Sequence, residues 1–137
     1  MTLPFENLKV LLADDYESIR KRLSHDLQRL GFKVVEASNG FEALTKLRSE
    51  KFDILFTDLV MPEMDGFELC EEVRKMPDIQ AIPIVVVSTH CDNEYILKAL
   101  RLGADDYVTK PIDAVLLEKV VRRAMIPTLQ LKAPGAA

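Results

Sequence analysis

The stretch DILFTDLVMPEMDGFELC, residues 53–70, decides the fold class. An apolar run ends on Asp58, passes through a Met-Pro step and turns at Asp65 and Gly66 into a segment with helical spacing. This is the pattern of a buried strand that leads through a loop into a helix. A carboxylate at the end of a buried strand is costly unless a nearby group uses its charge, so Asp58 is a candidate functional residue.

The same alternation runs along the whole chain. Strand-like apolar runs are expected at 8–13, 32–37, 53–58, 82–88 and 106–110, and amphipathic stretches with helical spacing follow them. Parallel strands need long crossover connections, which these helices would supply. The sequence therefore predicts an α/β fold built on a parallel sheet.

Two of the expected helices begin with residues that are typical helix N-caps. Asn39 followed by Glu42 is a variant of the capping box, and Asp113 is an expected cap of the last helix. The apolar residues expected to face the core are Phe41, Leu44 and Leu47 in the second helix, and Val115, Leu116, Val120 and Val121 in the last.

The last helix is expected to end near Ala124. Beyond Pro127 the sequence lacks periodicity. We therefore expect one domain over residues 6–125 and a flexible C-terminal tail over residues 126–137.

Composition limits the classes of function. The 137 residues suit one domain, and 48% hydrophobic with 29% charged residues is a globular mixture. A net charge of −4 makes direct nucleic-acid binding improbable. The chain shows neither a signal peptide nor a membrane span, and Cys70 and Cys91 form no metal-binding or redox pattern, so a cytoplasmic location is the expectation.

Polar residues gather where the expected strands end. Asp14 and Asp15 follow the first strand, Asp58 the third, Ser88 and Thr89 the fourth, and Lys110 and Pro111 the fifth. In open α/β sheets, ligands bind outside the carboxyl ends of the strands. Three carboxylates repel one another unless a cation joins them, and an all-oxygen set suits Mg²⁺ better than zinc.

Four motifs in this order resemble the receiver domain of two-component signalling, the domain of chemotaxis-like response regulators. They are the Asp14-Asp15 pair, the string Asp58-x-x-Met61-Pro62-x-Met64-Asp65-Gly66, Ser88, and Tyr107-x-x-Lys110-Pro111, and the resemblance covers residues 6–125. It implies a doubly wound five-stranded parallel sheet in the order 2-1-3-4-5, a flavodoxin-like (βα)5 three-layer sandwich.

The resemblance also implies a phosphoacceptor function. Asp58 would take a phosphoryl group from the phosphohistidine of a sensor histidine kinase or of a histidine phosphotransfer protein. The carboxylates of Asp14, Asp15 and Asp58 and the backbone carbonyl of Val60 would hold Mg²⁺. Lys110 would pair with Asp58 and then with the phosphoryl oxygens.

Further residues receive roles from the same resemblance. Pro111 would follow a cis peptide bond. Ser88 and Tyr107 would form the switch, with Ser88 also close to the reacting group, and the output would be a changed surface over the fourth helix, fifth strand and fifth helix. That surface would control a downstream protein target or an output domain, and a phosphorylation-dependent homodimer is compatible with it.

Three positions bear on how accessible and how long-lived the phosphoryl group is. Thr89 lies where the family often has a smaller residue, so its bulk would slow transfer. Val60 and His90 occupy the variable positions that tune hydrolysis in this family. Because the Val60 side chain cannot orient water by a hydrogen bond, we expect a moderately long-lived phosphorylated state.

Other interpretations stay open at this point. Asp14 or Asp15 could cap the first helix, and Tyr107 could belong to the core. A Mg²⁺-dependent phosphohydrolase with an aspartyl nucleophile is the alternative function, although no D-x-D motif follows the first strand. A nucleotide or flavin binder is disfavoured by the absence of Gly-rich phosphate loops. We expect that the protein is not an enzyme, apart from catalysing its own phosphorylation and dephosphorylation.

Overall fold

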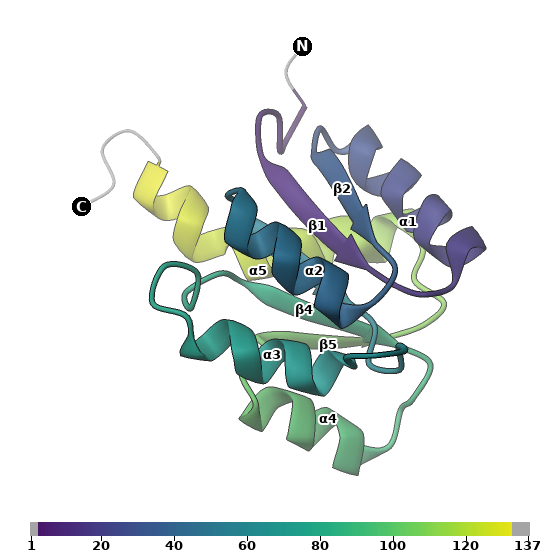
Figure 1. The fold of residues 1–137 in the computed structure, drawn as a ribbon. Helices are drawn as coiled ribbons and strands as arrows, with labels where there is room; N and C mark the ends of the chain where they lie inside the picture. The colour runs from purple at the N-terminus through teal and green to yellow at the C-terminus, as the bar shows by residue number, and fades with distance from the viewer. Residues whose placement is uncertain (1–2, 133–137) are drawn as a thin grey trace.

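The computed structural model describes the backbone of residues 3–132 and the side chains of residues 3–126. Strands and helices alternate strictly along it (Figure 1). The elements are β1 (Lys9–Ala13), α1 (Glu17–Arg29), β2 (Lys33–Ala37), α2 (Gly40–Ser49), β3 (Ile54–Thr57), α3 (Gly66–Lys75), β4 (Ile84–Ser88), α4 (Asn93–Arg101), β5 (Asp106–Thr109) and α5 (Ala114–Lys132). Each strand lies within the run predicted for it.

The five strands form one parallel sheet in the order β2-β1-β3-β4-β5, which confirms the predicted topology. Leu11 of β1 is in register with Val35 of β2 and with Leu55 of β3. On the other side of β3, Leu55 is in register with Ile84 of β4. Because every strand points the same way, all five carboxyl ends meet at one edge of the sheet.

Helices cover both faces of the sheet, giving three layers (Figure 1). Helices α1 and α5 pack on one face through residues such as Leu27 and Val120, while α2 and α3 cover the other through residues such as Leu47 and Leu69. Burying a leucine or valine side chain stabilises a fold by about 1.5–3 kcal/mol. The two apolar layers therefore fix the position of the sheet and of the residues that follow the carboxyl ends of its strands.

Helix caps agree with the sequence. The Asn39 side chain accepts a hydrogen bond from Glu42 N at 2.7 Å, and the Asp113 side chain accepts one from Leu116 N at 2.8 Å. Each bond satisfies a backbone N–H that has no partner inside its helix.

Some predicted core positions are wrong. Phe41 is 58% exposed and Val115 is 67% exposed, and Leu116 also lies at the surface. Two residues along a helix rotate a side chain by about 200°, so Phe41 points away when Ala43 faces the sheet. In α5 the buried stripe runs through Leu117, Val120, Val121 and Met125, at i, i+3, i+4 and i+8, and it leaves the two earlier residues outside.

The end of α5 also differs from the prediction. The helix continues through Pro127 to Lys132, where the sequence led us to expect an end near Ala124 and a flexible tail from residue 126. A proline inside a helix removes one backbone hydrogen bond, but a helix anchored by packing on its preceding turns can continue beyond it. Residues 133–137 of the predicted tail lie outside the described part of the chain. Among the described residues, no helix combines the length and apolar character that crossing a membrane requires.

Candidate functional site

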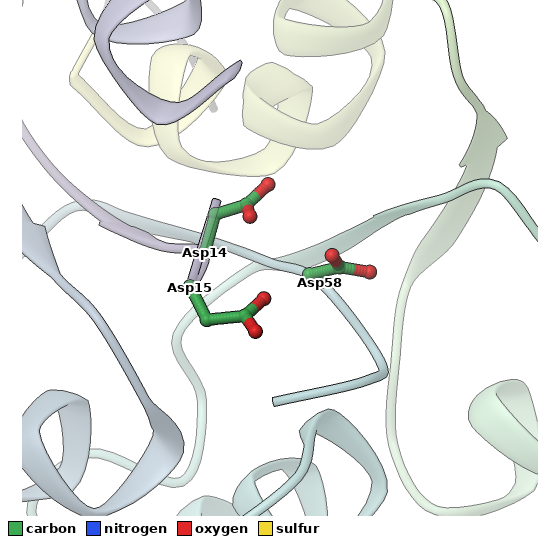
Figure 2. A group of neighbouring side chains, drawn as sticks. All are labelled: Asp14, Asp15 and Asp58. Carbon is green, nitrogen blue, oxygen red and sulfur yellow. The ribbon is translucent and has the colours of Figure 1, made fainter. Parts of the chain in front are cut away.

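Three carboxylates meet at the carboxyl edge of the sheet. Asp14 and Asp15 directly follow β1, and Asp58 directly follows β3, which is the strand paired with β1. Figure 2 shows the three side chains as neighbours. Each residue offers one carboxylate oxygen such that the three oxygens lie within 4.8 Å of one another. The structure thus brings together the acidic residues that the sequence singled out.

Lys110 lies beside two of these acids. Its Nζ is 2.8 Å from Oδ2 of Asp14 and 3.0 Å from Oδ2 of Asp58, and its side chain is only 8% exposed. The backbone N–H of Lys110 donates to the carbonyl of Ser88 at 2.8 Å, which ties the end of β5 to the end of β4. The peptide bond between Lys110 and Pro111 is cis. One almost fully covered ammonium therefore pairs with two carboxylates, of which Asp14 is buried and Asp58 is partly buried.

The ionisation of Asp58 and Lys110 reflects this arrangement. Burial raises the pKa of the Asp58 carboxyl above its ordinary range; the charge and hydrogen bond of Lys110 oppose the rise, and the charge of Asp14 adds to it. For Lys110, burial alone would lower the pKa of the ammonium, but its hydrogen bond to Asp14 and the charges of Asp58 and Asp14 raise it overall. Lys110 is thus held in its charged form.

The two acids after β1 have different surroundings. Asp14 is 2% exposed, and its Oδ1 accepts a hydrogen bond from Tyr16 N at 2.9 Å. Arg20 of α1 donates to the backbone carbonyl of Asp14, also at 2.9 Å. Asp15 is exposed to solvent. Asp14 is therefore buried and fixed by hydrogen bonds from Tyr16 and Arg20, while the carboxylate of Asp15 is accessible to solvent.

The loop after Asp58 is shaped by close backbone contacts. The Oδ1 atom of Asp58 accepts a hydrogen bond from Leu59 N at 2.7 Å, and Gly66 N donates to the Leu59 carbonyl at 2.8 Å. A Cβ atom on Gly66 would overlap the carbonyl oxygen of Asp58. Asp65 caps α3 through a 2.9 Å bond from Glu68 N. The Asp-Gly step is thus needed because the start of α3 passes against the residue that carries the central carboxylate.

Ser88 and Tyr107 are linked through one backbone. Ser88 is fully buried, and its Oγ accepts a hydrogen bond from His90 N at 3.2 Å. The hydroxyl of Tyr107 donates to the carbonyl of His90 at 2.6 Å. Burial raises the pKa of the Tyr107 phenol, against a lowering by a side-chain hydrogen bond with Ser88. The sequence did not indicate this role of His90, because a backbone contact leaves no signature in residue type.

The three positions expected to affect access and lifetime, Val60, Thr89 and His90, differ in exposure. Val60 is 59% exposed. Thr89 is exposed and lines a mostly apolar pocket beside Lys110 and Pro111, between α1 and the loop after β5. His90 is half-buried.

The acidic group fits a divalent cation of the hard type. Its three donors are all carboxylates, which suit Mg²⁺. Three negative charges face the single positive charge of Lys110, so an uncompensated negative charge is left for an ion to neutralise. The donor chemistry therefore agrees with the magnesium predicted from the sequence.

Comparison with known proteins identifies the family. Residues 10–122 match the family model of the response regulator receiver domain, so this chain belongs to that family. Members are phosphoacceptor signalling switches of two-component systems, and they bind Mg²⁺ at an acidic pocket.

Two of the curated relatives are named as transcriptional regulators. The chain is 39% identical over 132 residues to the probable transcriptional regulator ycf27 of Pyropia yezoensis, covering 93% of this chain and 53% of that protein. It is 36% identical over 132 residues to the alkaline phosphatase synthesis transcriptional regulatory protein PhoP of Bacillus subtilis, covering 92% of this chain and 54% of the relative. The chain thus spans about half the length of these curated relatives.

Solved structures share the fold closely. The chemotaxis protein CheY4 of Vibrio cholerae is 36% identical, with a TM-score of 0.81, over 85% of this chain and 98% of that one. A response regulator from Clostridium difficile is 29% identical, with a TM-score of 0.82, over 89% of this chain and 98% of that one. The flavodoxin-like architecture expected from the sequence is confirmed.

Proposed function

We propose that Asp58 is the phosphoacceptor of this receiver domain and that a histidine kinase or a histidine phosphotransfer protein is its donor. In this reaction an oxygen of the Asp58 carboxylate attacks phosphorus, the bond from phosphorus to the histidine nitrogen breaks, and an acyl phosphate forms. The observation that carries the proposal is the placement of Asp58, which pairs with Lys110 at 3.0 Å and shares a space with Asp14 and Asp15.

The cofactor of this reaction would be Mg²⁺. The residues that would hold it are Asp14, Asp15 and Asp58, with the backbone carbonyl of Val60. When bound, the ion neutralises charge on the phosphoryl oxygens during the transfer. The open position of Asp15 supports entry of an ion from solvent, because its carboxylate is the exposed member of the group.

Lys110 and Ser88 act on the phosphoryl group itself. The Lys110 ammonium already lies against the Asp58 carboxylate and would pair with the phosphoryl oxygens after transfer. The hydroxyl of Ser88 would donate a hydrogen bond to one of these oxygens, and Tyr107 would follow because both residues bond to His90. A shift from 1:99 to 99:1 between two states needs about 5.5 kcal/mol, which several charge-assisted hydrogen bonds can supply in large part.

The output would be a changed surface over α4, β5 and α5. We propose that this surface acts on a protein target or an output domain in the cytoplasm, and that it also supports a homodimer when phosphorylated. The acidic charge balance favours a protein partner over direct contact with nucleic acid, although the relatives are transcriptional regulators. Beyond its own phosphorylation and dephosphorylation, the chain would turn over no substrate. The comparisons offer no support for the phosphohydrolase alternative.

Intact-mass measurement after incubation with acetyl phosphate and Mg²⁺ tests the proposal. We expect one added phosphoryl group on the wild type and none on Asp58→Ala. The control Asp78→Asn, which changes an exposed aspartate between α3 and β4, should also gain one. Unchanged labelling of Asp58→Ala would show that another residue is the acceptor. The rate at which the phosphoryl group is gained and lost, compared between the wild type and the variants Val60→Asn and Thr89→Ala, would measure the effect of these two positions on access and lifetime.

A further inference from the structure

Three aromatic rings connect the loop after β4 to α3. The ring of His90 lies against Tyr95 in the first turn of α4, with centroids 4.6 Å apart and planes at 32°. Tyr95 stacks in turn on Phe67 of α3, with centroids 6.0 Å apart and planes at 12°. In Figure 1, α3 and α4 lie side by side, as their contacts also show. We call His90, Tyr95 and Phe67 the aromatic series.

One end of the aromatic series belongs to the residue that joins the two switch positions. The backbone N–H of His90 donates to Ser88 Oγ at 3.2 Å, and its carbonyl accepts from the Tyr107 hydroxyl at 2.6 Å. A displacement of Ser88 toward a phosphoryl group would therefore move the backbone of His90. The ring of His90 would move with that backbone and displace Tyr95, whose ring it contacts.

The amino-terminal end of α4 has few other attachments. Of its nine residues, all within the described part of the chain, only Ala99 is fully buried. The side chain of the N-cap residue Asp92 makes no capping hydrogen bond. The Asp92 carbonyl accepts from Tyr95 N at 3.1 Å and from Ile96 N at 3.2 Å, but a helix end without a side-chain cap is less stable than one that has it. The stacking of Tyr95 is thus a side-chain contact that joins this end of the helix to α3 and to His90.

The carboxyl-terminal end of α4 is anchored in a different way. Arg74 of α3 donates to the carbonyl of Gly103, just beyond α4, at 2.9 Å from Nε and 2.6 Å from Nη2. Lys98 lies 4.4 Å from the centroid of the Phe67 ring and adds a contact nearer this end. The two ends of α4 therefore differ in their attachments, with hydrogen bonds from Arg74 just beyond the later end and ring stacking by Tyr95 in the first turn.

We propose that His90 is a positioning residue that carries the displacement of Ser88 and Tyr107 through the aromatic series to the first turn of α4. This inference rests on the proposed function and deepens it, since it names the route by which phosphorylation of Asp58 reaches the output surface. The flat ring of His90 performs the role. Another aromatic residue at position 90 keeps the function, and a residue without a ring loses it.

The tyrosines of the chain provide the readout. There are three, Tyr16, Tyr95 and Tyr107, so the full chain labelled with 3-fluorotyrosine gives three fluorine NMR signals, identified by single Tyr→Phe changes. Spectra are recorded before and after addition of acetyl phosphate and Mg²⁺, and intact mass is measured on the same samples. The variants are His90→Ala and His90→Leu, which both lack a ring, and His90→Phe, which keeps one.

In the wild type and in His90→Phe, the signals of Tyr107 and Tyr95 should both shift on phosphorylation. In His90→Ala and His90→Leu, the Tyr107 signal should still shift, because its partner is the backbone carbonyl of residue 90, while the Tyr95 signal should lose most of its shift. Using two variants without a ring ensures that poor folding of one does not decide the outcome.

Two kinds of failure can be told apart. If Asp58 is labelled but Tyr95 shifts equally in the wild type and in both variants without a ring, the aromatic series transmits nothing and the inference is overturned while the proposed function stands. A wild-type Tyr95 signal that does not respond to labelling has the same consequence. If the wild type gains no phosphoryl group at Asp58, the proposed function fails and the inference fails with it.

Discussion

The ammonium of Lys110 lies 3.0 Å from the carboxylate of Asp58, across a distance of 52 residues in the sequence. The same Nζ atom is 2.8 Å from Asp14, so a single cation pairs with one buried and one partly buried acid at the carboxyl edge of the sheet. With Asp15 beside them, three carboxylates share one ammonium, so the site carries more negative than positive charge.

Replacing Asp58 with asparagine should stabilise the protein in the absence of metal. Because burial raises the pKa of Asp58 above its ordinary 3.8, the ionised carboxylate costs stability, and this cost grows as the pH rises from 3.8 through the folded-state pKa. Thermal unfolding of Asp58→Asn without Mg²⁺ should give a Tm higher by about 2–5 °C at pH 7, and the gain should shrink at pH 4. A variant less stable than the wild type at pH 7 would contradict the expectation.

Replacing Lys110 with methionine should destabilise the fold. It leaves the buried Asp14 and the partly buried Asp58 without their cation, and removing one partner of a buried ion pair typically costs about 3–5 kcal/mol. The pKa of Lys110 is raised above 10.5, so its contribution is fully present below pH 10.5 and is lost as the pH rises through the folded-state value. Urea unfolding should show a constant difference from pH 7 to pH 9. The exposed Lys119→Met serves as control and should stay within about 0.5 kcal/mol of the wild type.

Magnesium should stabilise the wild type by occupying the acidic group. A ligand that binds only the folded state at about ten times its Kd adds about 1.4 kcal/mol. The exposed carboxylate of Asp15 is one of the three donors, so Asp15→Asn should lose most of this gain in a thermal shift titration. Asp78→Asn should respond as the wild type does. An equal response of both variants would place the ion elsewhere.

Adding a single methyl group at position 66 should disturb the site. The Cβ of Gly66→Ala would overlap the carbonyl of Asp58, so the start of α3 or the end of β3 must shift. We expect a loss of about 2–3 kcal/mol in the free energy of unfolding, as for other overpacked positions, and slower labelling of Asp58 by acetyl phosphate. Glu71→Ala, on the exposed face of the same helix, should change neither measurement. Normal stability and labelling of Gly66→Ala would mean that the backbone relaxes at little cost.

The fold class could be predicted from sequence because it depends on local patterns. The apolar runs that end on Asp58 and Ser88, and the caps at Asn39 and Asp113, each mark an element by spacing within a few residues. The gathering of Asp14, Asp15 and Asp58 followed from their positions at the ends of predicted strands, whereas the strand order came from the resemblance to a family. The structure then placed Asp14, Asp15 and Asp58 within reach of one ion.

The burial of residues that depends on the rotation of a whole helix was harder to predict from the sequence. Phe41 and Val115 are apolar and close to buried residues in sequence, yet they are exposed, because the rotation of α2 and α5 is set by which stripe fits the sheet. The continuation of α5 past Pro127 was missed for a related reason, since local propensity is a weak guide where packing on preceding turns supports a helix.

By itself, the sequence determined the alternation of strands and helices and the polar residues at the strand ends, since these follow from short-range periodicity. Only the tertiary structure decided that Lys110 serves both Asp14 and Asp58, that Gly66 passes against Asp58, and that the backbone of His90 joins Ser88 to Tyr107. Those relationships join atoms from distant segments. Their distances depend on how the sheet and its two helical layers pack, which no local pattern of residues specifies.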